Sequence, residues 1–518
     1  MRLLANQTNE EPVVLGEGDV SIDSIVRVAR HKAKVIFSDE FNQRVTRSSN
    51  LVNKFVKENR IIYGVTTGFG KNVEFVISSE EAEQLQTNIV RSHAAAVGEP
   101  VEKEVARALM MMHLVNTGKG YSGIRLETLN LIRDMLNADI IPYAPGEGSV
   151  GYLAVEAYFV LAYIGEGRIW SDDKVINSKI ALEMKGLSPI KLTYKEGLSM
   201  INGSMSVCAY ASMALYDMKN ATKNIDISGS LAFEALKGNV KALDARLHSM
   251  KQHKDQNNAA EILRKLLDES EIMDHYEGNT VQDAYSLRCT PHIHGAAKKI
   301  IKDAYDVITD EINSVSDNPI IYPNEDYSDG TALMGGNFDG SFVSIYCDSA
   351  ALGACMLAKI VDKRMDRIVS SELSGYPSFL VKNPGLNNGY MIPQYTISGL
   401  YSEISNLSTP VSVQSITTCA RQEEPVSLAY LSGKKLYKIS KKLKYIAAIE
   451  IMMSVQGLDF LKPLKPSKIN RMVYDVIRKE VPELDQDRFY HYDIEYIYSL
   501  INDETLVKMV EEKIGSLL

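Results

Sequence analysis

The sequence lacks most of the features that would place it outside the cytoplasm or on a nucleic acid. Its five cysteines include no CxxC pair, which favours buried free thiols in a reducing compartment. The first residues turn polar too soon for a signal peptide. The longest apolar candidate, residues 152–164, contains Glu156 and is too short to span a bilayer. A formal net charge of -9 argues against a nucleic-acid role, because binding a phosphate backbone needs clustered Lys and Arg. We therefore expect a cytoplasmic protein with no nucleic-acid or membrane partner.

Strand signals are also few and short, and residues 320–322 are one example. Helical patterns dominate instead, and segment 290–315 carries the clearest one, with Pro291 suited to a first turn. Its apolar stripe consists of Ile293, Ala297, Ile300, Ala304, Val307, Ile308 and Ile312. Segments 341–372 and 425–457 have similar patterns, and 316–340 has the Pro, Asn and Gly breakers of a loop. The pattern predicts an all-α protein, a bundle of long helices with an irregular N-terminal region.

The length of 518 residues exceeds one ordinary core and suggests two or three subdomains or one unusually long helical body. We divide the chain into an N-terminal region over 1–200, a central bundle of long helices over 201–460, and a C-terminal helical segment over 461–518.

Nine short motifs occur in a fixed order along the chain. They occupy residues 63–70, 85–95, 148–154, 196–203, 281–289, 316–319, 335–338, 385–387 and 422–423. Together they resemble the MIO-dependent ammonia-lyase family, the histidine, phenylalanine and tyrosine ammonia-lyases with the related aminomutases. The resemblance implies a helical fold of the ammonia-lyase and fumarase type, elongated, with the reactive loop in the N-terminal region. It also implies a homotetramer whose active sites are each built from three subunits.

One family motif is incomplete. The family pattern after Gly-Ser-Val-Gly is Ala-Ser-Gly-Asp, but here Tyr152 follows Gly151 directly. In the family, Ala-Ser-Gly cyclises to 4-methylidene-imidazol-5-one (MIO), an electrophile that captures the substrate's amino group and improves it as a leaving group. The resemblance therefore predicts MIO between Gly151 and Tyr152 of the mature protein, formed without an external cofactor. The N-terminus of the following helix would stabilise negative charge building on the ring.

The resemblance also assigns roles to other residues. Tyr63, beside a glycine-rich loop, corresponds to the lid tyrosine that removes the β-proton, and Tyr285 to the second loop of the site. Arg288 suits a bidentate bond to the substrate carboxylate. Three amides, Asn202, Asn337 and Gln282, correspond to residues lining the pocket, and Phe338 to an aromatic stacked near the electrophile. We expect no metal, since His292 and His294 lack a third ligand at a recognisable spacing.

Substrate selectivity depends on two places in the chain. Ser92-His93 resembles the selectivity pair of histidine ammonia-lyases and of some tyrosine aminomutases, and Gln422-Glu423 resembles the pair of the histidine enzymes. A histidine and a carboxylate suit an imidazole, which offers one donor and one acceptor. The sequence therefore favours elimination of ammonia from L-histidine to give urocanate.

Two other functions stay open at this point. One is a tyrosine or phenylalanine ammonia-lyase or 2,3-aminomutase, because Arg421 and Pro425 stand where the histidine enzymes have Asn and His. The other is a helical assembly protein that has lost the tripeptide and its activity. Tyr152, Val155 and Glu156 also replace the family's usual Asp and Pro-Leu after the electrophile.

Overall fold

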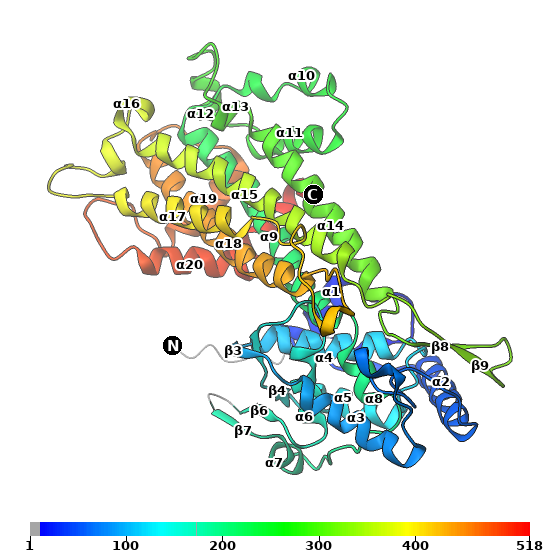
Figure 1. Cartoon of the computed structure of the whole chain (residues 1–518). Coiled ribbons are helices and arrows are strands. Elements are labelled where there is room, and N and C mark those ends of the chain that lie inside the picture. The colour runs from blue at the N-terminus through cyan, green and yellow to red at the C-terminus, as the bar shows by residue number, and fades with distance from the viewer. Residues whose placement is uncertain (1–10, 172–173) are drawn as a thin grey trace. The chain divides into compact units, whose positions relative to one another are not determined.

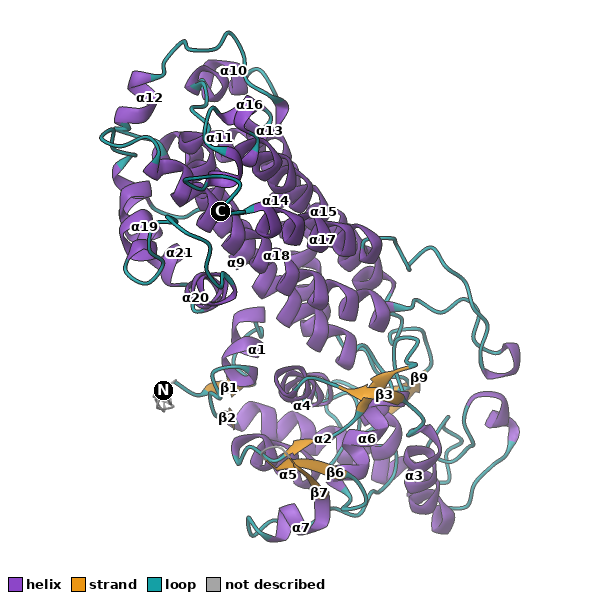
Figure 2. Cartoon of the chain, turned by 90° about the vertical axis from the view of Figure 1, so that its left-hand side faces the viewer, coloured by secondary structure: helices purple, strands orange, loops and turns teal. Residues whose placement is uncertain are grey.

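The computed structural model of the protein describes residues 11–171 and 174–518. Helices form most of it, and the strands are short (Figure 2), so the predicted all-helical class is confirmed. The chain forms two compact units, each assembled from three stretches. Unit 1 comprises residues 1–213, 305–347 and 410–434, and unit 2 comprises 214–304, 348–409 and 435–518. The division into 1–200, 201–460 and 461–518 stays a prediction.

Unit 1 contains short helices and four small sheets. Its helices are α1 (Ile22–Ala29), α2 (Asp39–Lys57), α3 (Ser79–His93), α4 (Lys103–Thr117), α5 (Leu126–Asn137), α6 (Ala154–Tyr163), α7 (Ser178–Glu183) and α8 (Glu196–Ile201), with the 3-10 turns η1 (Gly70–Glu74) and η4 (Cys419–Arg421). Its strands are β1 (Val13–Leu15), β2 (Val35–Phe37), β3 (Val97–Pro100), β4 (Ile141–Pro142), β5 (Pro145–Glu147), β6 (Arg168–Ser171), β7 (Lys174–Asn177), β8 (Ile320–Pro323) and β9 (Gly330–Leu333).

The sheets of unit 1 are β1-β2, β3-β5, β4-β6-β7 and β8-β9. Only β1 and β2 pair in parallel, with Val13 opposite Val35. The strand predicted at 320–322 is confirmed as β8, which pairs with β9 inside the segment predicted to be a loop.

Unit 2 contains the long helices, several of which enter it from unit 1. Its helices are α9 (Met205–Ala235), α10 (Ala245–Ser249), α11 (Lys254–Leu266), α12 (Glu271–His275), α13 (Tyr285–Arg288), α14 (Thr290–Asn313), α15 (Ser341–Val369), α16 (Ser371–Ser374), α17 (Met391–Leu407), α18 (Ala429–Asp459), α19 (Lys468–Arg478), α20 (His491–Asn502) and α21 (Thr505–Ile514), with the 3-10 turns η2 (Val240–Leu243) and η3 (Ser378–Leu380). Within unit 2, α15, α17 and α18 run side by side (Figure 1).

The stripe predicted for 290–315 is the buried face of α14. Of its seven predicted members, Ala297, Ala304, Ile308 and Ile312 are buried, and Ile301 joins them at the same spacing. The other three, Ile293, Ile300 and Val307, are only half-buried at the edge of this face. Helix α15 is long and apolar enough to cross a membrane by length and composition alone, but 56% of its most apolar window is buried within the protein.

Candidate functional site

Five residues singled out from the sequence line one cavity of about 700 Å³ in unit 1. They are Tyr63, His93, Asn202, Phe338 and Glu423. Ser92 of the selectivity pair and Tyr152 at the incomplete motif also line the cavity. The rest of the lining consists of residues that the sequence did not single out, namely Gly68, Phe69, Gly70, Asn72, Phe75, Ile77, Leu85, Asn88, Ile89, Leu153, Leu198, Asn318 and Cys419. The lining therefore includes residues from seven of the nine motifs, which span residues 63 to 423 of the sequence.

Tyr63 belongs to a glycine-rich loop that folds back on its side chain. The backbone N–H of Gly70 donates to the Tyr63 phenol oxygen at 3.0 Å, and the Phe69 ring lies edge-on at 6.2 Å. Gly64 and Gly70 have φ of +64° and +53°, a left-handed conformation that glycine adopts without strain. The loop thus presents the phenol to the cavity.

A buried amide fixes this loop to the rest of the site. The Gln86 side chain on α3 donates to the Gly64 carbonyl at 2.8 Å and accepts from the Leu198 N–H at 3.1 Å. A Cβ at Gly197 would lie 2.5 Å from the Gln86 carbonyl oxygen, so glycine permits this close approach of α3 and α8. Gln86 was noted only as part of a motif, and its structural role depends on these long-range contacts.

The electrostatics of unit 1 keep the Tyr63 phenol neutral. Burial raises its pKa most, the nearby Glu423 and Cys419 raise it further, and the Gly70 N–H opposes them. A tyrosine accepts a proton only as phenolate, which positive charge favours. Proton abstraction by Tyr63 therefore needs positive charge or further hydrogen-bond donors near the phenol.

His93 ends α3 with one ring nitrogen already bonded. Its Nδ1 lies 2.8 Å from the Ile89 carbonyl oxygen, which can only accept, so Nδ1 carries the proton and Nε2 is the acceptor. Burial lowers the pKa of His93, partly offset by the Ile89 bond and by Glu423. A neutral His93 therefore offers a hydrogen-bond acceptor through Nε2.

Glu423 is held by a tight reversal of the chain. The Thr418 hydroxyl donates to its carboxylate at 2.8 Å, and the Thr418 N–H donates to its backbone carbonyl at 3.1 Å. Between Thr418 and Glu423, the three residues of the 3-10 turn η4, Cys419 to Arg421, are all non-glycine and have positive φ values of 49°, 51° and 68°. This costly backbone conformation is typical of functional sites. Cys419 and Glu423 line the cavity as a result.

The loop that carries Gly151 and Tyr152 leads into the N-terminus of α6. The Tyr152 ring packs edge-on against Phe338 at 5.4 Å, and burial raises the pKa of its phenol. Leu153 has φ 78° and ψ -65°, a strained conformation for a leucine, and its N–H donates to the Ile201 carbonyl at 3.0 Å. Helix α6 has no side-chain cap, so its first N–H groups are directed toward this loop.

Two asparagine side chains, those of Asn202 and Asn318, line the same cavity. The Asn202 side chain donates to the Asn318 carbonyl at 3.2 Å, and the Asn318 side chain accepts from the Gly335 N–H at 2.9 Å. Asn318 was missed as a site residue, although its Ser-Asp-Asn-Pro motif was recognised. Asn337 is exposed beside Phe338, and its amide donates to the Val315 carbonyl at 3.2 Å.

The remaining predicted residues lie elsewhere. Gln282 and Arg288 line a cavity of about 560 Å³ in unit 2, and the Arg288 guanidinium lies 4.6 Å from the ring centroid of the exposed Tyr285. Gln422 is exposed and does not line the unit 1 cavity. Among residues 11–171 and 174–518, no group of three His, Cys, Asp or Glu side chains is placed to hold a metal.

Known proteins resemble the chain over almost its whole length. The family model for aromatic amino acid lyases matches residues 20–479. The histidine ammonia-lyase of Alkaliphilus oremlandii is 37% identical over 505 residues, which cover 97% of this chain and 99% of that protein. The crystal structure of histidine ammonia-lyase from Trypanosoma cruzi superposes with a TM-score of 0.90 at 33% identity, covering 97% of this chain and 95% of that one.

A tyrosine aminomutase structure from Streptomyces globisporus superposes equally well, with a TM-score of 0.91 at 27% identity, covering 97% of this chain and 99% of that one. The helical fold is therefore shared by lyases and aminomutases, and the fold alone does not separate the two reactions. The match over residues 20–479 and the full-length relatives do establish the family. The chain is a carbon–nitrogen lyase that belongs to the aromatic amino acid lyase family.

Proposed function

We propose that the protein eliminates ammonia from L-histidine to give urocanate. The observation that carries the proposal is that His93 and Glu423 line the same cavity as Tyr63. The neutral His93 can accept a hydrogen bond from one imidazole nitrogen of the substrate, and the Glu423 carboxylate can accept one from the other if that nitrogen is protonated. The naming of full-length relatives as histidine ammonia-lyases supports the same substrate.

The surroundings of Gly151 and Tyr152 fit the MIO group that the family resemblance implies. A Cβ at Gly151 would lie 3.4 Å from the Ser427 hydroxyl, which is buried with no hydrogen-bond partner among the described residues. Tyr152, Leu153, Asn202 and Phe338 line the cavity. The tripeptide itself is not between Gly151 and Tyr152 in the printed sequence. We infer that the mature protein carries the group at this junction.

When present, MIO supplies the electrophile that makes the substrate's amino group a better leaving group. The chain's own residues do the rest. Tyr63 takes the β-proton, while His93 and Glu423 orient the ring. Asn202 contributes its side-chain amide to the lining of the cavity. The aromatic rings of Phe69 and Phe338 exclude water, which strengthens each of these hydrogen bonds.

The proposal includes a cytoplasmic homotetramer with shared active sites. Tyr63 needs positive charge or further hydrogen-bond donors to act as a base, and the predicted carboxylate-binding group Arg288 lies in unit 2 with Tyr285 and Gln282. We propose that these residues, with Asn337 and Gln422, complete the active site from neighbouring subunits. Apolar side chains exposed on unit 2 support self-association: Leu352, Met356, Ile392 and Tyr395 are 46%, 37%, 57% and 62% exposed.

Two measurements test the proposal. Incubation with L-histidine should release urocanate and ammonia, and a cinnamate or a β-amino acid from tyrosine or phenylalanine as the preferred product would replace the substrate assignment. The intact mass should exceed that of the 518 printed residues by an Ala-Ser-Gly less two waters. A mass equal to the printed chain would remove MIO from the mechanism. Borohydride, which adds to the methylidene, should abolish turnover.

A further inference from the structure

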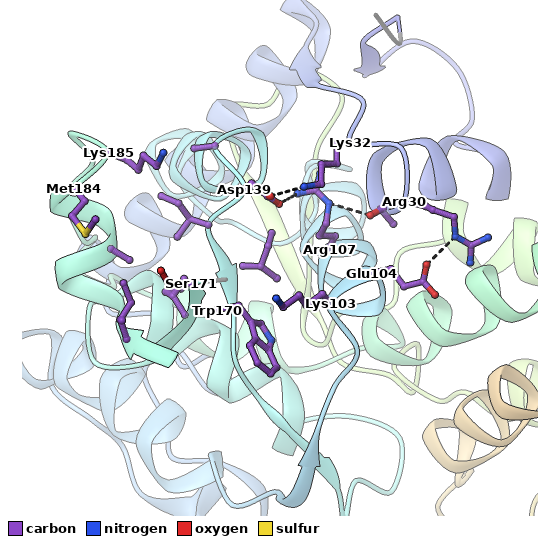
Figure 3. Close-up of a pocket in the computed structure, with 17 residues that line it drawn as sticks. Arg30, Lys32, Lys103, Glu104, Arg107, Asp139, Trp170, Ser171, Met184 and Lys185 are labelled. Atoms are coloured by element: carbon purple, nitrogen blue, oxygen red, sulfur yellow. Dashed lines mark hydrogen bonds and ion pairs between the residues drawn. The ribbon is translucent and has the colours of Figure 1, made fainter. Parts of the chain in front are cut away.

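Several charged side chains around a second cavity of unit 1, of about 570 Å³, have partners within the fold (Figure 3). Arg107 pairs with Asp139 at 2.7 Å and donates to backbone carbonyls in the last turns of α1 and α5. Arg30 pairs with Glu104 of α4 at 2.8 Å. These bonds satisfy carbonyls that a helix C-terminus leaves open, and they join α1, α4 and α5. Their role is structural.

A buried hydroxyl beside the first cavity has no such partner. Ser427 lies between η4 and α18, and its buried side-chain oxygen makes no hydrogen bond to any described residue. A Cβ at Gly151 would lie 3.4 Å from this oxygen, and a Cβ at Gly340 would lie 3.3 Å from it. The Ser427 hydroxyl therefore lies where three segments of unit 1 meet, and one of them is the loop that carries Gly151.

The surroundings of Ser427 are apolar. Its neighbours Val426 and Leu428 form a buried cluster with Val411, and Val150, in the loop that carries Gly151, packs against this cluster. A hydroxyl in such surroundings is costly without a partner, because it has given up its hydrogen bonds to water. A group that completes this loop would supply the partner.

The MIO group offers the acceptor that this hydroxyl lacks. As an imidazol-5-one it has a ring carbonyl oxygen, which can only accept a hydrogen bond, whereas a serine hydroxyl can donate one. A nucleophile that adds to the methylidene carbon moves an electron pair onto the carbonyl oxygen. A hydrogen-bond donor at that oxygen stabilises the negative charge that develops there.

We propose that Ser427 is a positioning residue that donates a hydrogen bond to the ring carbonyl of MIO. Ser427 does not line the cavity that contains Tyr63 and Glu423, so it acts on the group and not on the substrate. The inference rests on the proposed function, because it requires the group at the Gly151–Tyr152 junction.

Cyanide addition to the full-length protein tests this role without any turnover. The intact mass first shows which chains carry the ring. The gain of one hydrogen cyanide per chain is then followed with time, as the cyanide carbon bonds to the methylidene carbon and the ring takes up a proton from water. Ser427→Ala should keep the ring and add cyanide about 10- to 100-fold more slowly than wild type, because the charge on the carbonyl oxygen has lost its donor.

Two further variants make the result decisive. Ser454→Ala is the matched control, since Ser454 also has a buried hydroxyl without a partner among the described residues but lies in α18 within unit 2. It should add cyanide at the wild-type rate. Ser427→Cys replaces the hydroxyl by a weaker donor and should also slow the addition. It takes the place of Ser427→Ala if the alanine variant does not fold.

The proposal is overturned if Ser427→Ala or its cysteine replacement adds cyanide as fast as wild type. Folded Ser427 variants that carry no ring would also overturn it, because Ser427 would then be needed to form the group and not to bond to it. A wild-type mass equal to that of the 518 printed residues would instead remove MIO itself, and the role of Ser427 with it. The intact mass of the wild type therefore distinguishes failure of this inference from failure of the proposed function.

Discussion

Replacing Glu156 by glutamine should make the protein more stable at neutral and alkaline pH. Glu156 lies in the first turn of α6, is fully buried, and has no hydrogen-bond partner for either carboxylate oxygen among the described residues. Burial raises the pKa of this carboxyl to about 7. The folded protein therefore retains a proton on Glu156 where an exposed glutamate has lost it.

The effect of the substitution on stability follows from the difference between the pKa of Glu156 in the folded protein and its pKa in the unfolded protein. Below the unfolded pKa of about 4.5 both states hold the proton, and the group costs nothing. As pH rises from there through 7, the unfolded state releases its proton first and stability falls. The cost is about 1 kcal/mol at pH 5 and about 3 kcal/mol at pH 8. Glu156→Gln removes this dependence, because the amide does not titrate.

The assay is thermal unfolding of wild type and Glu156→Gln at pH 5, 6, 7 and 8. A chain of this length has an unfolding entropy of about 1 kcal/mol per degree, so the Tm gap should widen by about 2 °C between pH 5 and pH 8 in favour of the variant. Glu512→Gln, at an exposed position of α21, is the control and should follow wild type. Parallel profiles of wild type and Glu156→Gln would show that the buried carboxyl is not held protonated, and would refute this reasoning.

Four other substitutions test the catalytic cavity and the buried Lys195–Asp317 ion pair. Tyr63→Phe should keep the fold and lower kcat by about two to four decades, because the ring still packs but the proton acceptor is gone; near-normal turnover would exclude Tyr63 as the base. Asp317→Asn should lower the unfolding free energy by about 3 to 5 kcal/mol, since it leaves the fully buried Lys195 unpaired, and an unchanged Tm would contradict that. His93→Leu should reduce kcat/KM for histidine by about 5- to 150-fold and favour phenylalanine, and Glu423→Gln should act in the same direction. A wild type that prefers tyrosine would disprove the imidazole assignment.

The long helices were predictable from sequence because their stabilisation follows a local period. Residues at spacings of three and four in α14 face the same side, so the apolar stripe alone predicted the helix. The pairing of β1 with β2 was not predictable, because each strand has only three residues and its partner lies some twenty positions away. Such short strands exist only where tertiary contacts support them.

The motifs of the sequence determined the family and most of the residues for which we propose catalytic roles, including Tyr63 and Gln282. Only the tertiary structure decided which of them share a cavity in one unit: Tyr63 and Glu423 do, and Gln282 does not. Long-range packing creates this cavity. The burial and the charge around a side chain depend on neighbours that are distant in sequence, whereas a periodic pattern describes only the helix that carries it.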